Sequence, residues 1–302
     1  MNRSLAAGRA AQLACLWEAT AHKPGNVHPE ASFSDVCYDH YVASAAAIAP
    51  AMEQAASQPL GSTILAAVEA TQRAVGRNTN LGTILLLAPL ASVPASGPLR
   101  SGVATALGRL TTTDAAQIYE AIQRARPGGM GSTAKMDVQG PPPDDLLSAM
   151  RAAADRDMIA RQYAENFDPL FEEIIPRLRI AHHEESMPLE TAIVHVHLQV
   201  MHTFPDSLIA RKCGVQVAEE AAERAGAVLS AGPTGSEAYR TALAELDRYL
   251  RGDGHRRNPG TTADLLAAAL FSLLRDGIIT ESEPPGGRLV RQTIPSTENA
   301  DA

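Results

Sequence analysis

The feature that most constrains the fold of this chain is a succession of alanine- and leucine-rich segments, separated by short breaks that contain proline or glycine. Alanine and leucine have high helix propensity, whereas aromatic residues make up only 4% of the sequence. Apolar residues recur at helical spacing, and no segment shows the strict alternation of a half-buried strand. The sequence therefore predicts an all-α fold.

The breaks divide the chain into about ten predicted helices. The third is expected to end at Gly76, and Asn80 or Thr79 is expected near the cap of the buried helix that follows. Asp35 is predicted to cap the second helix. The predicted helical segments are 2–21, 35–57, 61–75, a buried segment from about 80, 113–125, 144–166, 168–181, 188–202, 206–230, 235–251 and 260–276.

Residues 1–280 are predicted to form a single domain. The Gly/Pro-rich segment 127–143 has the composition of a linker, and a loop of this length is typical of a functional or mobile segment. Polar clusters in both halves of the chain contribute to one proposed site, however, which favours one domain with a long central loop. Residues 281–302 lack helical periodicity and are expected to form a disordered tail.

The net charge of −8 argues against general binding to nucleic acids or to anionic membranes, although it is compatible with a local basic pocket. The three cysteines show no CxxC spacing and no signal-peptide pattern precedes them, so a reducing, cytoplasmic location is expected. No apolar run approaches the length of about 18 residues that a transmembrane helix requires. The oligomeric state is left open.

Polar residues are concentrated at three junctions between a loop and a helix: residues 18–28 (EATAHKPGNVH) followed by Asp35, residues 76–82 (GRNTNLG) and residues 255–274 (HRRNPGTTADLLAAALFSLL). The N–H groups at a helix N-terminus attract phosphate, and Lys23 and Arg257 offer positive charge nearby. Asp264 is suited either to stabilise the helix dipole or to hold a magnesium ion on bound phosphates. Because each junction alone is more typical of an ordinary helix start, the prediction of a phosphate site rests on their combination.

A cluster of histidines between residues 182 and 202 suggests, as a minor hypothesis, a helical metal-dependent hydrolase. His195 and His202 are seven residues apart and can share a helix face, whereas His197 points elsewhere, and no HExxH motif is present. The glycines near residue 130 lack the GK[ST] sequence of a Walker loop, and no GxSxG nucleophile motif occurs.

In this order and spacing, the three junctions resemble the triphosphoribosyl-dephospho-CoA synthase family. These all-α enzymes build the prosthetic-group precursor of citrate lyase and malonate decarboxylase. The resemblance extends over about residues 10–280. It is carried by EATAHKPGNV, by Asp35 with YVASA ending at Ser44, by NTNLGTILLL and by NPGTTADLLAAALF.

The resemblance implies an enzyme that moves the triphosphoribosyl group of ATP to a hydroxyl of dephospho-CoA or a related acceptor and releases adenine. Such a transfer needs a carboxylate near the cationic sugar carbon, a base for the acceptor hydroxyl and a proton for adenine. The implied catalytic residues are Glu18, Asp35 and Asp264, in roles that the sequence leaves open. The implied nucleotide- or phosphate-binding residues are Lys23, Gly25, Asn26, Asn78, Thr79, Asn80, Gly82, Arg257, Asn258, Gly260, Thr261 and Thr262, and the implied Mg²⁺ ligands are Asp35, Asp264 and Asp137.

The chain departs from the family pattern at several positions. Phe33 stands where well-known members have a histidine, Asn80 and Leu81 replace a histidine and a lysine, and RPGGMGSTAKMDVQG replaces a central loop rich in Gly, Arg and Glu. The pattern is similar to divergent forms linked to tetrahydromethanopterin one-carbon pathways. ATP or a related nucleotide is therefore the expected donor, and the acceptor stays open. An alternative hypothesis is a catalytically altered nucleotide-binding or accessory protein of a one-carbon or cofactor biosynthesis pathway.

Overall fold

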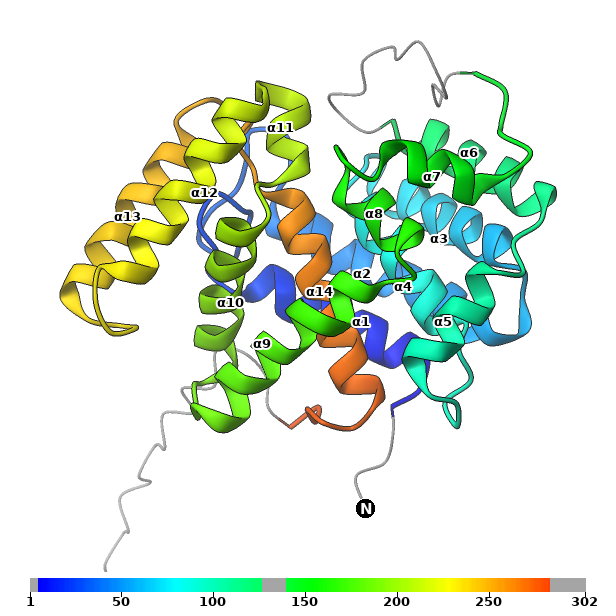
Figure 1. The fold of residues 1–302 in the computed structure, drawn as a ribbon, viewed down its shortest axis with the longest axis horizontal. Coiled ribbons are helices and arrows are strands. Elements are labelled where there is room, and N and C mark those ends of the chain that lie inside the picture. The colour runs from blue at the N-terminus through cyan, green and yellow to red at the C-terminus, as the bar shows by residue number, and fades with distance from the viewer. Residues whose placement is uncertain (1–4, 127–139, 283–302) are drawn as a thin grey trace, which may run out of the picture.

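The alanine- and leucine-rich segments form fourteen α-helices in a computed structural model that describes residues 5–126 and 140–282 (Figure 1). These ranges contain no β-strand, so the all-α prediction is confirmed. A 3₁₀ turn, η1 (Ala55–Ser57), and two π-helical segments, η2 (Leu170–Ile174) and η3 (Ile180–Glu184), accompany the α-helices. The α-helices are α1 (Ala7–Thr20), α2 (Tyr38–Gln54), α3 (Leu60–Val75), α4 (Leu81–Ala91), α5 (Leu99–Leu107), α6 (Thr112–Ala125), α7 (Leu146–Ala153), α8 (Met158–Ala164), α9 (Ile175–Arg179), α10 (Leu189–Thr203), α11 (Ser207–Cys213), α12 (Val215–Ser230), α13 (Glu237–Arg251) and α14 (Gly260–Arg275).

The prediction of about ten helices was too low because it merged short helices and missed one. The α5 helix was not predicted, and segment 144–166 is divided where Asp157 caps α8 by accepting hydrogen bonds from two backbone N–H groups. Segment 206–230 is likewise divided into α11 and α12 at Gly214, which has a φ of 101°. The expected cap Asp35 is wrong, because α2 begins at Tyr38 with Cys37 as its N-cap.

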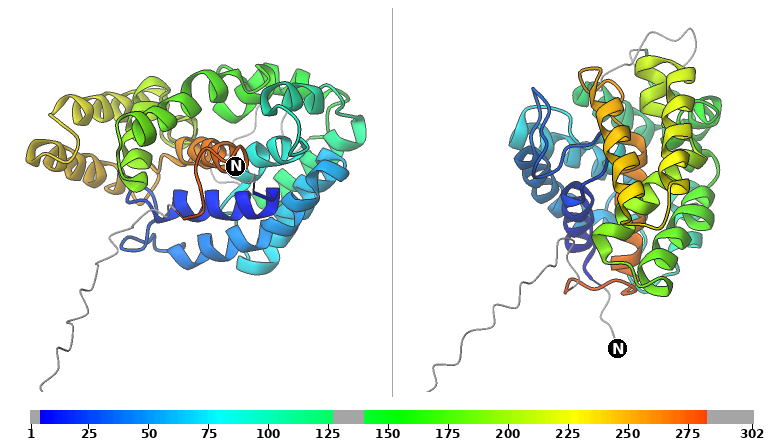
Figure 2. Two further views of the ribbon diagram at one scale, coloured as in Figure 1. Left: turned by 90° about the horizontal axis from the view of Figure 1, so that it is seen from below. Right: turned by 90° about the vertical axis from the view of Figure 1, so that its left-hand side faces the viewer.

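The last helix, α14, is the core around which the others pack. All residues from Leu265 to Arg275 are buried, and α1, α4, α9, α10 and α11 surround it (Figures 1 and 2). Its sequence, LLAAALFSLL, has no charged face, as expected for a helix enclosed on all sides. Within the described ranges, no helix combines the length and the hydropathy needed to cross a bilayer.

A second hydrophobic cluster lies beside the main core. It is built from α10 to α13, and the α12–α13 pair forms one flank of the molecule (Figure 1). Helix α10 belongs to both clusters, because Val196 and Val200 pack in the main core whereas Leu198 and Met201 pack in the second. This shared helix favours the predicted single domain over residues 1–280, which stays a prediction. Residues 283–302, the expected tail, lie outside the described part of the chain.

Candidate functional site

A cavity of about 930 Å³ lies where α1, α4 and α14 meet the turn before α8 and the helix α11. This volume is in the range of small-molecule sites. Residues from all three predicted junctions line it. The predicted site residues in its wall are Glu18, Asn26, Asn78, Thr79, Asn80, Gly82, Asn258, Gly260, Thr261 and Asp264.

Glu18 reaches the cavity from the last turn of α1 and is paired with Lys23. The Lys23 ammonium lies 2.9 Å from Glu18 Oε1 and also donates hydrogen bonds to the carbonyls of Glu18 and Ala21. The Lys23 side chain is fully buried and does not line the cavity. The structure therefore places the charge of Lys23 on Glu18 and on the end of the helix, rather than at a position where it meets bound phosphate.

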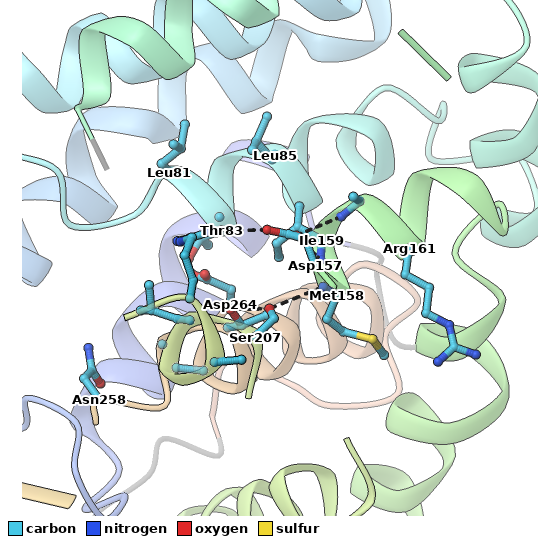
Figure 3. Close-up of a pocket in the computed structure, with 18 of the residues that line it drawn as sticks. Leu81, Thr83, Leu85, Asp157, Met158, Ile159, Arg161, Ser207, Asn258 and Asp264 are labelled. Carbon is cyan, nitrogen blue, oxygen red and sulfur yellow. Dashed lines mark hydrogen bonds and ion pairs between the residues drawn. The ribbon is translucent and has the colours of Figure 1, made fainter. Parts of the chain in front are cut away.

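Asp264 faces the cavity from α14, opposite the start of α4 (Figure 3). The Thr83 hydroxyl donates a 2.5 Å hydrogen bond to Asp264 Oδ1. Burial, with a smaller contribution from the charge of Glu18, raises the pKa of Asp264 to about 8. A Cβ on Gly82 would come within 2.0 Å of Asp264 Oδ2, so the absence of a side chain at Gly82 is what lets this carboxyl approach α4. Burial therefore favours the protonated form of Asp264 near neutral pH.

Two asparagines in the cavity wall have unused hydrogen-bonding groups. Asn26 donates a 2.6 Å hydrogen bond to Asn258 Oδ1, which ties the first junction to the third, while its own Oδ1 has no protein partner. The side-chain Nδ2 of Asn80 is also buried without a partner. Because buried polar groups are normally satisfied, these amides are suited to hydrogen-bond a ligand.

The remaining polar residues of the second junction organise the entry to α4. Asn78 Oδ1 accepts a hydrogen bond from the backbone N–H of Leu81, so Asn78 supplies the side-chain cap. The Thr79 hydroxyl lies 2.6 Å from the hydroxyl of Ser44 on α2. Both contacts fix the polar wall of the cavity.

Asp35 lies apart from the other two predicted catalytic carboxylates. Its side chain is 66% exposed and does not line the cavity. Its backbone carbonyl accepts a hydrogen bond from Arg77, and its carboxylate lies 3.8 Å from His255 Nε2. His255 in turn stacks on Phe33 with ring centroids 4.3 Å apart. Only Glu18 and Asp264 of the predicted catalytic set therefore share the cavity.

Three further predicted phosphate-binding residues contact other parts of the protein. Gly25 has a φ of 74° and approaches α13 so closely that a Cβ would lie 2.8 Å from Leu250 Cβ. The Arg257 guanidinium lies over the ring of Tyr249, 4.4 Å from its centroid. The backbone and hydroxyl of Thr262 each donate a 2.8 Å hydrogen bond to Asp206 Oδ2. None of the three lines the cavity.

The predicted Mg²⁺ set is not assembled. Asp35 and Asp264 do not meet, Asp137 lies outside the described residues, and residues 5–126 and 140–282 contain no group of three potential ligands. The same finding removes support for the hydrolase hypothesis. His197 is fully buried with both ring nitrogens unpartnered, and burial keeps its pKa well below the ordinary value.

Cys15 also lines the cavity but is unsuited to act as a nucleophile. Burial, and then the charge of Glu18, raises the pKa of its thiol, so the reactive thiolate is disfavoured. Of the predicted catalytic residues, the cavity therefore offers the carboxyl groups of Glu18 and Asp264.

The sequence analysis did not predict several residues that organise the cavity region. Asp206 is buried, caps α11 through the N–H groups of Leu208 and Ile209, and binds the start of α14, which joins two walls of the cavity. The Ser207 hydroxyl donates to Thr261 and accepts from the N–H of Met158 (Figure 3). The PDS sequence before α11 is a helix-cap signal, but nothing in it shows that three helices converge there.

Comparisons with known proteins show to which family the chain belongs. Residues 4–280 match the family model of ATP:dephospho-CoA triphosphoribosyl transferase (CitG). The chain is also similar to the crystal structure of a "putative triphosphoribosyl-dephospho-coA synthase" from Archaeoglobus fulgidus, with 29% sequence identity and a TM-score of 0.61. That match covers 78% of this chain and 99% of the other. No curated protein gives a significant match.

Proposed function

The chain belongs to the ATP:dephospho-CoA triphosphoribosyl transferase family, and from this premise we propose that it is a pentosyl transferase. It moves the triphosphoribosyl group of ATP to a hydroxyl of dephospho-CoA or a related acceptor and releases adenine. The predicted family resemblance is confirmed by the family match, and ATP is a substrate of that family. A cytoplasmic location is proposed with it, because both substrates are intracellular metabolites.

The observation that carries this proposal is the different setting of Glu18 and Asp264 within one cavity. The Glu18 carboxylate has the Lys23 ammonium as counter-charge, whereas burial raises the pKa of Asp264 to about 8. A carboxylate with a counter-charge and a carboxyl group whose protonated form is favoured by burial are suited to act as a base and an acid. Glu18 is then the base, and Asp264 is the proton donor.

The proposed step balances without a further reactant. The bond from the ribosyl C1′ to adenine breaks, and Asp264 gives its proton to the departing adenine. The acceptor oxygen forms the new bond to C1′, and its proton passes to Glu18. The carboxylate of Glu18 also stabilises the positive charge that develops on the sugar. The neutral amides of Asn26 and Asn80 are available to hydrogen-bond the base or the ribose.

Magnesium is proposed as a counter-ion carried by the triphosphate, since Mg²⁺ in proteins is commonly held by substrate phosphates and the described residues contain no group of three potential ligands. A rate profile against pH separates the two roles considered for Asp264. A proton donor with a pKa of about 8 requires the rate to fall above that pH. A metal ligand requires the rate to rise as the carboxyl ionises, which would exclude the acid role.

The proposed function is tested by incubating the full chain with ATP, Mg²⁺ and dephospho-CoA. Adenine is quantified by chromatography, and the acceptor by mass spectrometry. We expect one adenine for each acceptor that gains a triphosphoribosyl group. Binding of ATP without adenine release, with dephospho-CoA and with related acceptor hydroxyls, would instead support the accessory-protein alternative.

A further inference from the structure

The positive charges of the cavity are confined to one wall. Among the described residues, every lysine and arginine that lines the cavity belongs to the α7–α8 turn, α8 or α11, namely Arg156, Arg161, Arg211 and Lys212. The opposite wall, from α1, α4 and α14, presents Glu18 and Asp264 and no cation. A ligand with an anionic end and a reacting centre at its other end is matched by this separation of charge.

Of the four cations that line the cavity, Lys212 has the fewest partners among the described residues. It lies in the last turn of α11, is half-buried, and has no hydrogen bond or ion pair through its ammonium in residues 5–126 and 140–282. Burial, and then the neighbouring charge of Arg211, lowers the pKa of Lys212. An anion bound in the cavity would supply the missing counter-charge.

The other three cations of this wall differ in how far protein groups already occupy their charge. Arg156 donates one hydrogen bond, to the Ala152 carbonyl at 2.9 Å, and has no carboxylate partner in the described part of the chain. Arg211 lies 3.2 Å from Asp157, whose other oxygen caps α8. Arg161 is paired with Glu165, and its guanidinium extends away from Asp264 (Figure 3). Arg156 and Arg211 are therefore the two arginines best suited to bind the same anion as Lys212.

Acidic residues on the same wall do not cancel this charge at Lys212. Asp155, Asp157 and Glu219 also line the cavity, but none forms an ion pair with Lys212. Asp157 is held by Arg211 and by two backbone N–H groups. Lys23 and Arg257, the cations expected from the sequence, are engaged elsewhere.

We infer that Lys212, assisted by Arg156 and Arg211, forms the subsite for the polyphosphate chain of a nucleotide substrate. The identity of the nucleotide in this inference rests on the proposed function. The preference for a polyphosphate anion rests only on the charges of the cavity wall. A lysine is a common phosphate ligand, and arginine adds planar, bidentate contacts. The polyphosphate belongs to ATP or to dephospho-CoA, and the experiment below distinguishes these sources.

The test is calorimetric titration of the full chain with inorganic tripolyphosphate, with ATP and with dephospho-CoA. Lys212→Met removes the charge and keeps the aliphatic length, Lys212→Arg keeps the charge, and Arg109→Gln removes an exposed charge away from the cavity. We expect Lys212→Met to weaken tripolyphosphate binding about tenfold or more, corresponding to about 1.4 kcal/mol. Lys212→Arg should retain most of the affinity, and Arg109→Gln all of it.

The two nucleotides assign the source of the anion. If Lys212→Met loses affinity for ATP alone, the subsite binds the triphosphate of ATP. If it loses affinity for dephospho-CoA alone, the subsite binds the pyrophosphate of dephospho-CoA. Unchanged affinity of folded Lys212→Met for all three ligands would overturn the inference, as would failure of the wild-type chain to bind any of them. Lys212-dependent tripolyphosphate binding without adenine release would overturn the proposed function and leave this subsite standing.

Discussion

At the residue scale, Lys23 affects both the stability of the protein and the charge of its candidate site. Its ammonium is the counter-charge of Glu18, and both side chains are largely removed from water. Removing one member of a buried ion pair leaves the other uncompensated, at a cost of about 3–5 kcal/mol. We therefore expect Lys23→Met to lower the free energy of unfolding in urea by roughly this amount.

The double variant Lys23→Met with Glu18→Gln is the matched control for that prediction. It removes both charges, so much of the lost stability should return, because no buried charge is left unpaired. If Lys23 were instead an exposed lysine that only binds phosphate, its replacement would leave the free energy of unfolding nearly unchanged. If Lys23→Met is as stable as the wild-type chain, the ion pair does not stabilise the fold as described.

Asp264 gives a prediction about pH. Its pKa is about 8 in the folded chain and near 3.8 in the unfolded chain, so the folded state binds more protons between these values. Its contribution to stability is therefore present at low pH and is lost as pH rises towards and through about 8. Asp264→Asn cannot ionise, so its melting temperature should fall less than that of the wild-type chain between about pH 6 and about pH 9.

Asp144→Asn serves as the control, since Asp144 is exposed and has no partner in the described residues. Its melting temperature should follow the wild-type curve over the same pH range. Identical pH curves for Asp264→Asn and the wild-type chain would show that Asp264 is already ionised at neutral pH, which would contradict its role as proton donor.

At the scale of helices, Gly82 determines how closely α4 approaches α14. A methyl group there would overlap Asp264 Oδ2, so Gly82→Ala should displace the carboxyl or separate the two helices. Overpacking of this kind typically costs about 1–3 kcal/mol. We expect a lower melting temperature together with loss of adenine release. Gly108→Ala is the control, because its nearest contact would be an ordinary 3.4 Å to the Ala104 carbonyl.

Helix positions were largely predictable from local sequence, and the exceptions have local causes. Gly76 ends α3 in the left-handed region, as its position after an apolar segment predicts. The short α5 escaped notice because Pro98 and Gly102 give its segment the composition of a loop. The division at Gly214 depends on a positive φ that only the folded chain reveals.

The direction of side chains was less predictable than the position of helices. The sequence places Lys23 after one predicted helix and Lys212 within another, but it does not show that the first side chain turns inwards and the second faces a cavity. That difference depends on which helices pack against each lysine. The sequence therefore indicated which motifs approach one cavity, whereas the surroundings of each charge required the tertiary structure.

At the scale of the whole molecule, the two hydrophobic clusters share α10. Since this helix cannot leave one cluster without disrupting the other, we expect them to unfold together. Differential scanning calorimetry should show one transition with equal calorimetric and van't Hoff enthalpies. Two resolved transitions would mean that the α10–α13 cluster is an independent unit, and would contradict the single domain predicted for residues 1–280.

The central claim is that Glu18 and Asp264 form the reacting centre of a triphosphoribosyl transferase. The most direct test is the rate of adenine release from saturating ATP and dephospho-CoA by the wild-type chain, Glu18→Gln and Asp264→Asn, with ATP affinity measured alongside. We predict that each variant binds ATP within about tenfold of wild type and loses about 10²–10⁴-fold in rate. A folded Asp264→Asn or Glu18→Gln variant that releases adenine at the wild-type rate would contradict the account.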